Sequence, residues 1–386
     1  MSHDDEDRVA QAAWQRVAQT RRIIIKVGSH LLTGGQEHLQ RDWIDRRCQE
    51  ICAILDTGRQ VVIVTSGAIA AGAARLHLGR KPVLLREKQA AAAAGQGVLM
   101  QCYEEAFVHH GRSVAQILLT REDVAHRRRY LNARDTLETL LMLGLVPIVN
   151  ENDTVVVEEI CFGENDTLAA LVAGLIDADL LLLLSDIDGL YDGDPRQSDG
   201  QARLIPLVHQ VTPDIERLAG GSGSQVGSGG MITKLHAARM AARSGCMTVI
   251  ANGFCEGVIP KILSGQPSGT LFLSEGDTIS SRKRWIANGL RSSGDLCLDE
   301  GAVSALLSGR SLLAKGIQRV QGHFDRGAAV RCLSPQGELL ARGLVNYSAD
   351  ALRSIAGHHS SEFEAILGFR GDDEVIHRDN LVVLRV

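Results

Sequence analysis

The segment IIIKVGSH carries a lysine, Lys26, inside an otherwise apolar run, with a glycine, Gly28, shortly after it. Burying an ammonium group without a partner is costly, and glycine lets the backbone approach a bound group closely. Two interpretations follow from these residues. Either Lys26 is aimed at a phosphate, or its long side chain extends from the end of a strand to solvent.

A second candidate anion site follows the apolar run VVIVT, where Ser66-Gly67 leads into the small-residue stretch AIAAGAARL. Backbone N–H groups at a helix start, together with the Ser66 hydroxyl, could hold an anion. A simple turn from strand to helix uses the same residue types. The sequence at this point therefore leaves both interpretations open.

Amides and carboxylates cluster at 150–153 (NEND) and 164–166 (END). Such groups could bind the ammonium and carboxylate of an amino acid, and they also cap helices and fill turns. Further on, Ser185-Asp186 ends the run LLLLLS and opens a loop rich in Asp and Gly. The loop lacks the spacing and the closing glutamate of an EF-hand, and we interpret it as the edge of a nucleotide site.

The stretch GGSGSQVGSGGMITK at 220–234 is more than half glycine up to Gly230. A glycine-rich loop that leads into a helix can surround phosphates with N–H groups, and Lys234 in the first turn adds fixed positive charge. A flexible linker is the alternative, but a helical pattern follows at once. Neither the Walker A pattern nor the Rossmann fingerprint occurs, so the sequence predicts a phosphate site of another type.

These residues follow apolar runs of strand length that alternate with helical patterns through the first 275 residues. Several runs are apolar throughout, which is typical of parallel strands covered on both faces. The pattern predicts an α/β fold, an αβα sandwich with a mainly parallel sheet, whose ligands bind beyond the carboxyl ends of the strands. The predicted strands are Ile23–Val27, Val61–Thr65, Ser113–Leu119, Val146–Asn150, Leu180–Ser185 and Cys246–Ala251, and two of the predicted helices are Arg41–Thr57 and Arg127–Leu143.

The pattern changes near residue 276, where a polar stretch without periodicity is followed by short strand-like segments broken by glycine. We therefore expect a small β-rich C-terminal domain. The predicted organisation is an N-terminal extension at 1–20, a main domain at 21–276, a linker at 277–291, the β-rich domain at 292–371 and a tail at 372–386.

Composition narrows the class of protein. The 386 residues are 45% hydrophobic and 23% charged, with a formal net charge of -5, which is the balance of a globular protein and argues against nucleic acid as the main partner. The eight cysteines show no Cys-x-x-Cys spacing, so we expect reduced thiols rather than zinc ligands or disulfides. No signal peptide or membrane-spanning run is recognisable, and we expect a cytoplasmic protein.

Seven segments occur in a fixed order: IIIKVGSHLLTGG, VVIVTSGAIAAG, LNARDTL, VPIVNEND, FGENDTLAA, LLLLSDIDGLYDGDPR and GSGGMITKLHAA. In this combination the chain resembles the glutamate 5-kinases of the amino acid kinase superfamily. The part containing DEGAVSALLSGRSLLAKGIQRVQGHFDRGAAV and ARGLVNYSADALRSIAGHHS resembles the PUA domain fused to many bacterial glutamate 5-kinases. The resemblance implies an amino acid kinase fold followed by a PUA-like domain.

The resemblance also implies a role for each matching residue. Lys26 and Lys234 would grip the ATP phosphates, and Asp166 would orient both lysines and is a candidate for contact with Mg²⁺, although we assign no metal ligand. L-Glutamate would be bound by Ser66, Asp153 and Asn165. The residues implied in ATP binding lie at strand ends and in the glycine-rich loop: Lys26, Gly28, Ser185, Asp186, Ser228, Gly229, Gly230, Met231, Ile232, Thr233 and Lys234.

The implied activity is ATP-dependent phosphorylation of the side-chain carboxylate of L-glutamate to L-glutamyl 5-phosphate, the first step of proline biosynthesis. Proline is then the expected feedback inhibitor, a homo-oligomer the expected assembly and a glutamyl phosphate reductase a candidate partner. Three positions depart from the family pattern: His30 replaces a small hydroxyl residue, Ser185 a threonine and Ile232 a serine. The departure at His30 bears on the detail of the phosphate loop rather than on the reaction.

Other substrates and another class of function remain as alternatives. Relatives on the same fold phosphorylate aspartate, N-acetylglutamate, carbamate or uridylate, whereas the NEND and GEND segments and the PUA-like domain favour glutamate. An RNA-binding PUA protein with a vestigial kinase domain is the alternative of a different class. Residues 292–371 contain equal numbers of acidic and basic side chains, so we do not expect RNA binding to be the main activity.

Overall fold

The computed structural model describes residues 3–36, 38–155, 164–193, 202–219, 230–276 and 292–384. The chain divides into two compact units, Met1–Val124 with Ala133–Thr278, and Ala125–Asn132 with Ile279–Val386. The glycine-rich segment 220–229, with the predicted ATP ligands Ser228 and Gly229, and the predicted linker 277–291 lie outside the described residues. Within the described ranges, no helix is long and apolar enough to cross a membrane.

The first unit is built on an eight-stranded sheet with the strand order β3-β4-β2-β1-β5-β7-β8-β6. All neighbouring strands are parallel except β7 and β8, which are antiparallel. This arrangement confirms the predicted α/β class with a mainly parallel sheet. The strands are β1 (Arg22–Val27), β2 (Gln60–Val64), β3 (Val114–Leu119), β4 (Val146–Glu151), β5 (Leu180–Ser185), β6 (Leu207–Val208), β7 (Met247–Asn252) and β8 (Thr270–Phe272).

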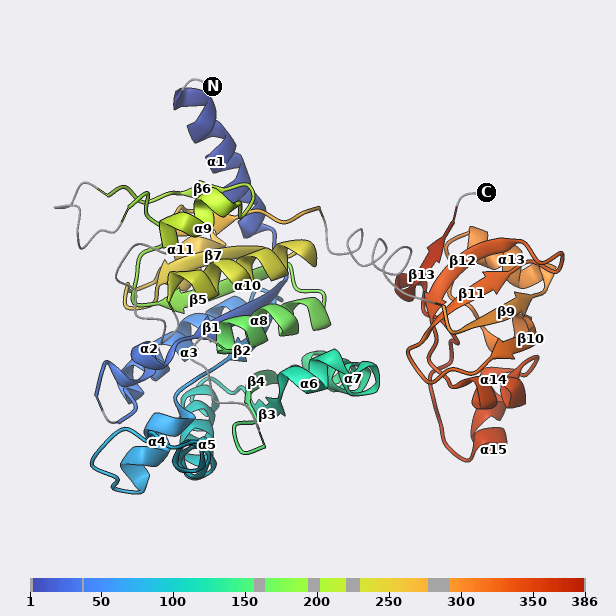
Figure 1. Cartoon of the computed structure of the whole chain (residues 1–386), viewed down its shortest axis with the longest axis horizontal. Helices are drawn as coiled ribbons and strands as arrows, with labels where there is room; N and C mark the ends of the chain where they lie inside the picture. Colours follow the sequence, from blue (N-terminus) through green and yellow to red (C-terminus); the bar gives the residue numbers. More distant parts are fainter. Residues whose placement is uncertain are drawn as a thin grey trace. The chain divides into compact units, whose positions relative to one another are not determined.

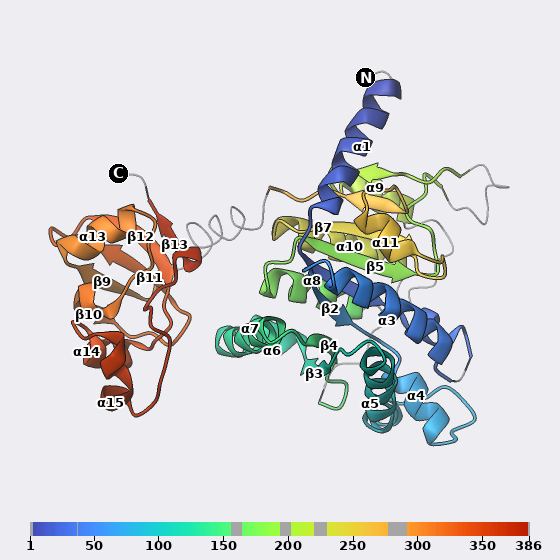
Figure 2. The ribbon, with the colours of Figure 1, turned by 180° about the vertical axis from the view of Figure 1, so that it is seen from behind.

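Helices cover both faces of this sheet (Figures 1 and 2). One hydrophobic core joins the sheet to α1, α3, α5 and α11, and on the opposite face α8 and α10 pack against β1, β5 and β7. Burial on both faces explains why β5 is leucine throughout up to its last residue. The helices that lie wholly or partly in this unit are α1 (His3–Ala18), α2 (Ser29–Thr33), α3 (Arg41–Leu55), α4 (Ala68–Arg75), α5 (Leu85–Val108), α6 (Arg121–Ala125), α7 (Arg127–Met142), α8 (Glu164–Leu175), α9 (Pro213–Ala219), α10 (Met231–Arg243) and α11 (Val258–Leu263).

The predicted N-terminal extension forms α1, whose inner face belongs to the core of the first unit. Trp14 and Val17 are fully buried there. The end of the helix is held by Arg59, whose guanidinium donates to the carbonyl oxygens of Thr20 at 2.9 Å and Ala18 at 2.6 Å. An arginine in this position satisfies carbonyl groups that a helix end leaves without intrahelical partners.

The second unit contains a five-stranded sheet with the order β10-β9-β11-β12-β13. It has its own core, which includes Leu296, Val330, Leu352 and the edge-to-face pair Tyr347 and Phe363. Its β-rich character matches the prediction. Its elements are β9 (Gly294–Leu298), α13 (Glu300–Leu307), β10 (Ile317–Gly322), β11 (Ala329–Leu333), β12 (Leu339–Leu344), α14 (Ala349–Ile355), α15 (Phe363–Leu367) and β13 (Leu381–Val383).

The segment that the sequence analysis sets apart as a tail, 372–386, differs from that description. Val375 and Ile376 are fully buried in the core of the second unit, and β13 pairs with β12 at the edge of its sheet. A strand of three residues is too short to show a periodic pattern, which is why the sequence gives no sign of it.

Candidate active site

The parallel strands bring most of the predicted site residues to one edge of the sheet. Lys26 lies near the end of β1, Ser66 follows β2, Asn150 lies near the end of β4, and Ser185 and Asp186 lie at the end of β5. Since β1 is central and pairs with β2 on one side and β5 on the other, Lys26 stands between the groups on β2 and β4 and the groups on β5.

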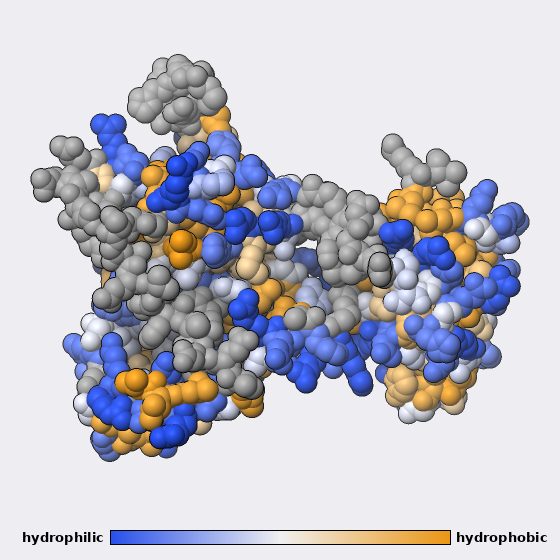
Figure 3. All heavy atoms as spheres, viewed as in Figure 1, coloured by the Kyte–Doolittle hydropathy of each residue, from blue (hydrophilic) through white to orange (hydrophobic). Residues whose placement is uncertain are grey.

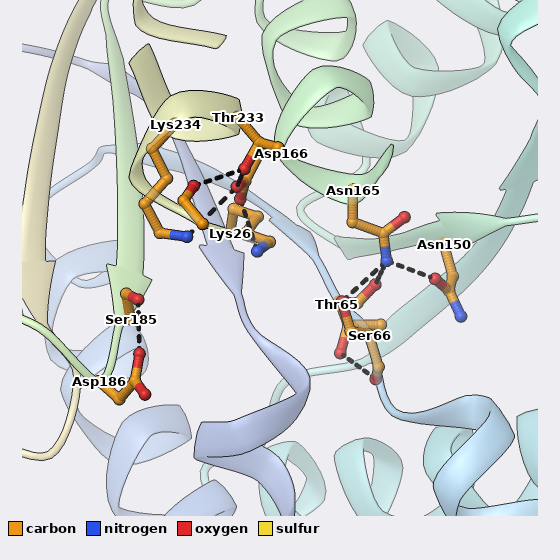
Figure 4. A network of polar contacts seen from close by, with 11 residues as sticks. Lys26, Thr65, Ser66, Asn150, Asn165, Asp166, Ser185, Asp186, Thr233 and Lys234 are labelled. Atoms are coloured by element: carbon orange, nitrogen blue, oxygen red, sulfur yellow. Dashed lines mark hydrogen bonds and ion pairs between the residues drawn. The ribbon is translucent and has the colours of Figure 1, made fainter. Parts of the chain in front are cut away.

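Asp166 holds two lysines together (Figure 4). Its Oδ1 lies 2.6 Å from the ammonium Nζ of Lys26, and its Oδ2 lies 3.4 Å from the Nζ of Lys234. The hydroxyl of Thr233 lies 2.9 Å from the same Oδ2. The Asp166 side chain is fully buried, and those of the two lysines are nearly so.

Local structure explains why these three charges meet. Side chains alternate between the faces of a strand; Ile23 and Ile25 of β1 enter the core under α3 and α11, so Lys26 points to the opposite face. On that face α8 and α10 pack against each other, and each contributes a residue from its first turn, Asp166 and Lys234. The meeting point is thus the end of one strand and the starts of two helices.

The electrostatics of the group favour a charged carboxylate. Burial alone raises the pKa of Asp166, but the ammonium groups of Lys26 and Lys234 and the hydrogen bonds from Lys26 and Thr233 outweigh it, so the pKa of this carboxyl lies below its ordinary value. Burial lowers the pKa of Lys234, with Lys26 adding to that effect and Asp166 opposing it. An anion that arrived beside Lys234 would favour the charged form of that lysine.

Asn165, next to Asp166, is the centre of a second polar network (Figure 4). Its amide Nδ2 lies 2.7 Å from the carbonyl oxygen of Thr65, 2.9 Å from the hydroxyl of Ser66 and 3.1 Å from Oδ1 of Asn150. The contact with a carbonyl oxygen fixes which end of the amide is the nitrogen. The other end, Oδ1 of Asn165, is buried without a hydrogen-bond partner among the described residues.

Gln96 of α5 belongs to the same network, although the sequence analysis does not predict it. Asn150 donates to its Oε1 at 2.8 Å, while its amide nitrogen Nε2 is buried without a partner within the described part of the chain. The unsatisfied donor on Gln96 suits the carboxylate of an amino acid, and the unsatisfied acceptor on Asn165 suits its ammonium group. A glutamine in the alanine-rich run AAAAAGQG is the sequence signal that could have indicated it.

Two glycines bring Gln96 this close to the strand ends. At the crossing of α4 and α5, a Cβ on Gly72 would lie 1.7 Å from the carbonyl oxygen of Ala91, and a Cβ on Gly95 would lie 1.9 Å from that of Ala68. Only glycine permits such an approach of two backbones. The spacing between the start of α4, which follows Ser66, and Gln96 therefore depends on these two positions.

The remaining predicted residues lie around the two networks. Ser185 donates to Oδ1 of the exposed Asp186 at 3.0 Å. Gly230 precedes α10 and offers no side-chain cap, so the N–H groups of the first turn, which includes Met231 and Ile232, suit an anion. Asp153 is half-buried in the turn after β4.

Gly28 separates the end of β1 from α2. Its backbone has an ordinary extended conformation, with φ of -73°. A Cβ placed there would lie 3.8 Å from Nζ of Lys26. The glycine therefore leaves space beside the lysine ammonium, and the backbone conformation does not require it.

The amino acid kinase family model matches residues 21–252, and the PUA domain model matches residues 294–367. The fold and the site thus define an amino acid kinase with an additional PUA domain. The glutamate 5-kinase of Geobacter sulfurreducens is 52% identical over 369 residues, covering 95% of this chain and 99% of that protein. The glutamate 5-kinases of Trichlorobacter lovleyi and Nitrosospira multiformis are 52% and 50% identical, each over 95% of this chain and covering 97% and 98% of those proteins. The chain belongs to the glutamate 5-kinase branch of the amino acid kinase family.

Replacing Asp166 by Asn should destabilise the protein in a way that depends on pH. At pH 7 we expect the free energy of unfolding to fall by about 3–5 kcal/mol, because two buried ammonium groups lose their carboxylate. The folded pKa lies below the unfolded one, so this stabilisation is fully present above about pH 4 and is lost as the pH falls through the folded pKa.

Urea unfolding of the wild type and of Asp166→Asn between pH 3 and pH 8 measures the difference in their free energies of unfolding. This difference should become smaller only at the acid end of the range. The matched control is Asp214→Asn on α9, whose side chain is exposed and whose replacement should leave stability unchanged. A difference that stays constant over the whole pH range would contradict the assignment.

Proposed function

We propose that the chain transfers the γ-phosphoryl group of ATP to the side-chain carboxylate of L-glutamate, giving L-glutamyl 5-phosphate and ADP, the first step of proline biosynthesis. One observation carries the proposal: Asp166 binds two lysines on one side, while the adjacent Asn165 binds Ser66 and Asn150 on the other. A phosphate site and an acceptor site would then meet at the start of α8. The full-length similarity to glutamate 5-kinases favours this activity over RNA binding.

The reaction requires alignment and charge neutralisation more than acid–base catalysis. The glutamate side chain has a pKa of about 4.3 and is ionised at pH 7, so a general base is unnecessary. A carboxylate oxygen forms a bond to the γ-phosphorus while the bond from that phosphorus to the β–γ bridging oxygen breaks, and ADP leaves. Positioning and electrostatic stabilisation supply most of the catalysis in such transfers.

Lys26 and Lys234 would bind the phosphates directly. Each ammonium has three N–H donors, so each can keep its contact with Asp166 and still donate to phosphate oxygens. Asp166 is then a positioning residue that holds both lysines in place. Ser185, Asp186 and the first turn of α10, Gly230 to Lys234, would contact the nucleotide, and Gly28 leaves room for it; we extend this role to Ser228 and Gly229 from the resemblance alone.

The acceptor would occupy the space around Asn165. Its unsatisfied Oδ1 would accept from the ammonium of glutamate, and the Nε2 of Gln96 would donate to the α-carboxylate. Ser66 and Asp153 complete the proposed set. This orientation points the side-chain carboxylate of glutamate toward Lys26 and Lys234.

Mg²⁺ is the expected companion of ATP, and its role is to neutralise charge on the phosphates. Such a Mg²⁺ is bound chiefly by phosphates and water, with one or two carboxylates from the protein. Asp166 does not fit this role, because both of its oxygens already face lysine and threonine. The exposed Asp186, at the carboxyl end of β5, fits it better.

The surface of the first unit bears on how copies of the chain assemble. Exposed apolar side chains gather over the α4 and α5 end of the first unit (Figure 3), among them Leu76, Val83 and Leu84, and such a patch suits a contact between copies of the chain. We propose a cytoplasmic homo-oligomer, and light scattering of Val83→Asp against wild type would test the contact.

The acyl phosphate product is reactive, so a glutamyl phosphate reductase is the proposed partner; co-sedimentation would detect a complex.

Proline should inhibit the enzyme by competing near the glutamate site. We expect the apparent KM for glutamate to rise with L-proline concentration. Proline is the end product of the pathway that this step opens, and it would compete with glutamate near the glutamate site. Glutamate titrations with and without L-proline measure this. An unchanged apparent KM and an unchanged rate would contradict the proposal.

The activity itself is tested by ADP release with ATP and Mg²⁺, with hydroxylamine present to trap an acyl phosphate as hydroxamate. We expect L-glutamate to give ADP and hydroxamate, and aspartate, N-acetylglutamate and uridylate to give neither. Lys234→Ala should abolish turnover, whereas Lys261→Ala on the exposed side of α11 should leave it intact. Absence of glutamate-dependent ADP from folded wild-type protein would refute the assignment.

Gln96 provides a test of the acceptor site. Gln96→Ala should raise the KM for glutamate about 10–100-fold, the scale of a hydrogen bond to a charged group, and should change the KM for ATP far less. Gln101→Ala is the matched control, because Gln101 lies exposed on the same helix and donates at the surface to Glu105. Equal changes in both KM values would mean that Gln96 serves the fold and not the acceptor.

A further inference from the structure

Three side chains of α3 point to one loop. Trp43, Arg47 and Glu50 follow each other at helical spacing and share a face. Their partner is the segment that runs from the last residue of β7 to the start of α11, residues 252–257, which we call the β7–α11 loop. We call the three side chains the α3 clamp.

The α3 clamp binds the backbone of the loop at every second residue. The indole Nε1 of Trp43 donates to the carbonyl oxygen of Gly253 at 3.0 Å. The Nη1 of Arg47 donates to the carbonyl oxygen of Cys255 at 3.1 Å. The N–H of Gly257 donates to Oε1 of Glu50 at 3.1 Å, so the loop is held along its length.

Arg47 and Glu50 also form an ion pair, with Nη2 and Oε1 2.9 Å apart and side chains that are 5% and 14% exposed. A buried ion pair is poor evidence for stability, because apolar residues of the same size often stabilise a protein as well or better. Apolar residues could not, however, bind a backbone carbonyl and a backbone N–H. The contacts to the loop are therefore what this pair provides.

The other side of the loop contacts Ser185, which is proposed to bind the nucleotide, and also Asp188 and His30. The backbone N–H of Gly253 donates to the carbonyl oxygen of Ser185 at 2.7 Å. The side-chain Nδ2 of Asn252 donates to Oδ1 of Asp188 at 2.9 Å. The ring of Phe254 meets the ring of His30 edge-on, with centroids 6.0 Å apart.

The loop has little freedom to shift between these neighbours. A Cβ on Gly253 would lie 2.4 Å from a methyl carbon of Leu31 in α2, so the loop backbone lies tight against the helix that follows Gly28. A displacement of the loop would therefore be transmitted both to Ser185 on β5 and to α2 beside β1.

We propose that Trp43, Arg47 and Glu50 are positioning residues for the nucleoside triphosphate, acting through the β7–α11 loop on Ser185 and on the His30 side of the site. This inference rests on the proposed function, in that it places the nucleotide at the carboxyl end of β5. None of the three side chains touches the reacting groups. The three side chains fix the position of the β7–α11 loop, and Ser185 and α2 pack against that loop.

The test compares the KM for ATP with the KM for glutamate. Arg47→Met keeps the packing of the side-chain stem and removes the guanidinium; it should raise the KM for ATP about tenfold, the scale of a charge-assisted hydrogen bond, and leave the KM for glutamate within about twofold. Arg47→Lys, which keeps the charge beside Glu50, should restore part of the loss. Arg41→Met is the matched control, because Arg41 lies on the same helix in an exposed pair with Glu105, and both KM values should stay as in wild type.

Trp43→Phe provides a second test that does not depend on the folding of Arg47→Met. It keeps an aromatic ring, removes the N–H donor to Gly253 and makes the side chain smaller, and the KM for ATP should rise about threefold, the scale of one neutral hydrogen bond. Wild-type values of the KM for ATP in folded Trp43→Phe and Arg47→Met, or equal changes in both KM values, would overturn the proposal.

Calorimetric binding of a non-hydrolysable ATP analogue with Mg²⁺ separates this proposal from the proposed function. If wild type binds the analogue and Arg47→Met binds it about tenfold more weakly, the positioning role stands even without glutamate turnover. If wild type turns over glutamate and both proteins bind the analogue equally, the activity stands and the positioning role is refuted.

Discussion

The buried carboxylate of Asp166 is the constraint on which the rest of the site depends. Two ammonium groups cannot be removed from water side by side unless an anion lies between them, and here that anion lies 2.6 Å from Lys26 and 3.4 Å from Lys234. The end of β1 and the first turns of α8 and α10 must therefore converge, and the helices must pack against each other on that face of the sheet. The same convergence places two ammonium groups beside each other at the strand ends, which is the arrangement that the proposed phosphate site requires.

The parallel sheet provides the distances that this convergence needs. The parallel strands β1, β2, β4 and β5 each bring polar residues to the same edge of the sheet, and helices pack on both faces of that sheet. On one face α8 and α10 supply charges; on the other, α3 holds the β7–α11 loop by its backbone. Close approach of α4 and α5 at Gly72 and Gly95 sets the remaining spacing. The β7–α11 loop is thus bound on the side that faces α3.

The sequence predicts the strands well because burial on both faces leaves a continuous apolar run; Leu180–Ser185 has the same bounds in the structure. It also predicts Lys26, Asn165 and Asp166 as candidates, because a lysine inside an apolar run and a cluster of amides and carboxylates stand out. It does not predict Gln96, whose partner Asn150 is 54 residues away, nor the contacts of Arg47 with Cys255, because pairing across such separations depends on tertiary packing. The short β13 escapes notice because three residues show no periodic pattern. The packing of α1 escapes notice because its contacts, such as that of Arg59 with Ala18, join residues far apart in the sequence.

The order of strands has an evolutionary consequence. The groups proposed to bind the acceptor stand on the β2 and β4 side of β1, the groups proposed to bind the nucleotide lie at the ends of β1 and β5 and at the start of α10, and the start of α8 contacts both sets. Mutations in the segments after β2 and β4 can therefore alter which acid is recognised while the machinery that handles the triphosphate is inherited unchanged. A sheet divided in this way allows one half to diversify under selection while the other half is conserved, so new acceptors can be acquired without a new catalytic apparatus.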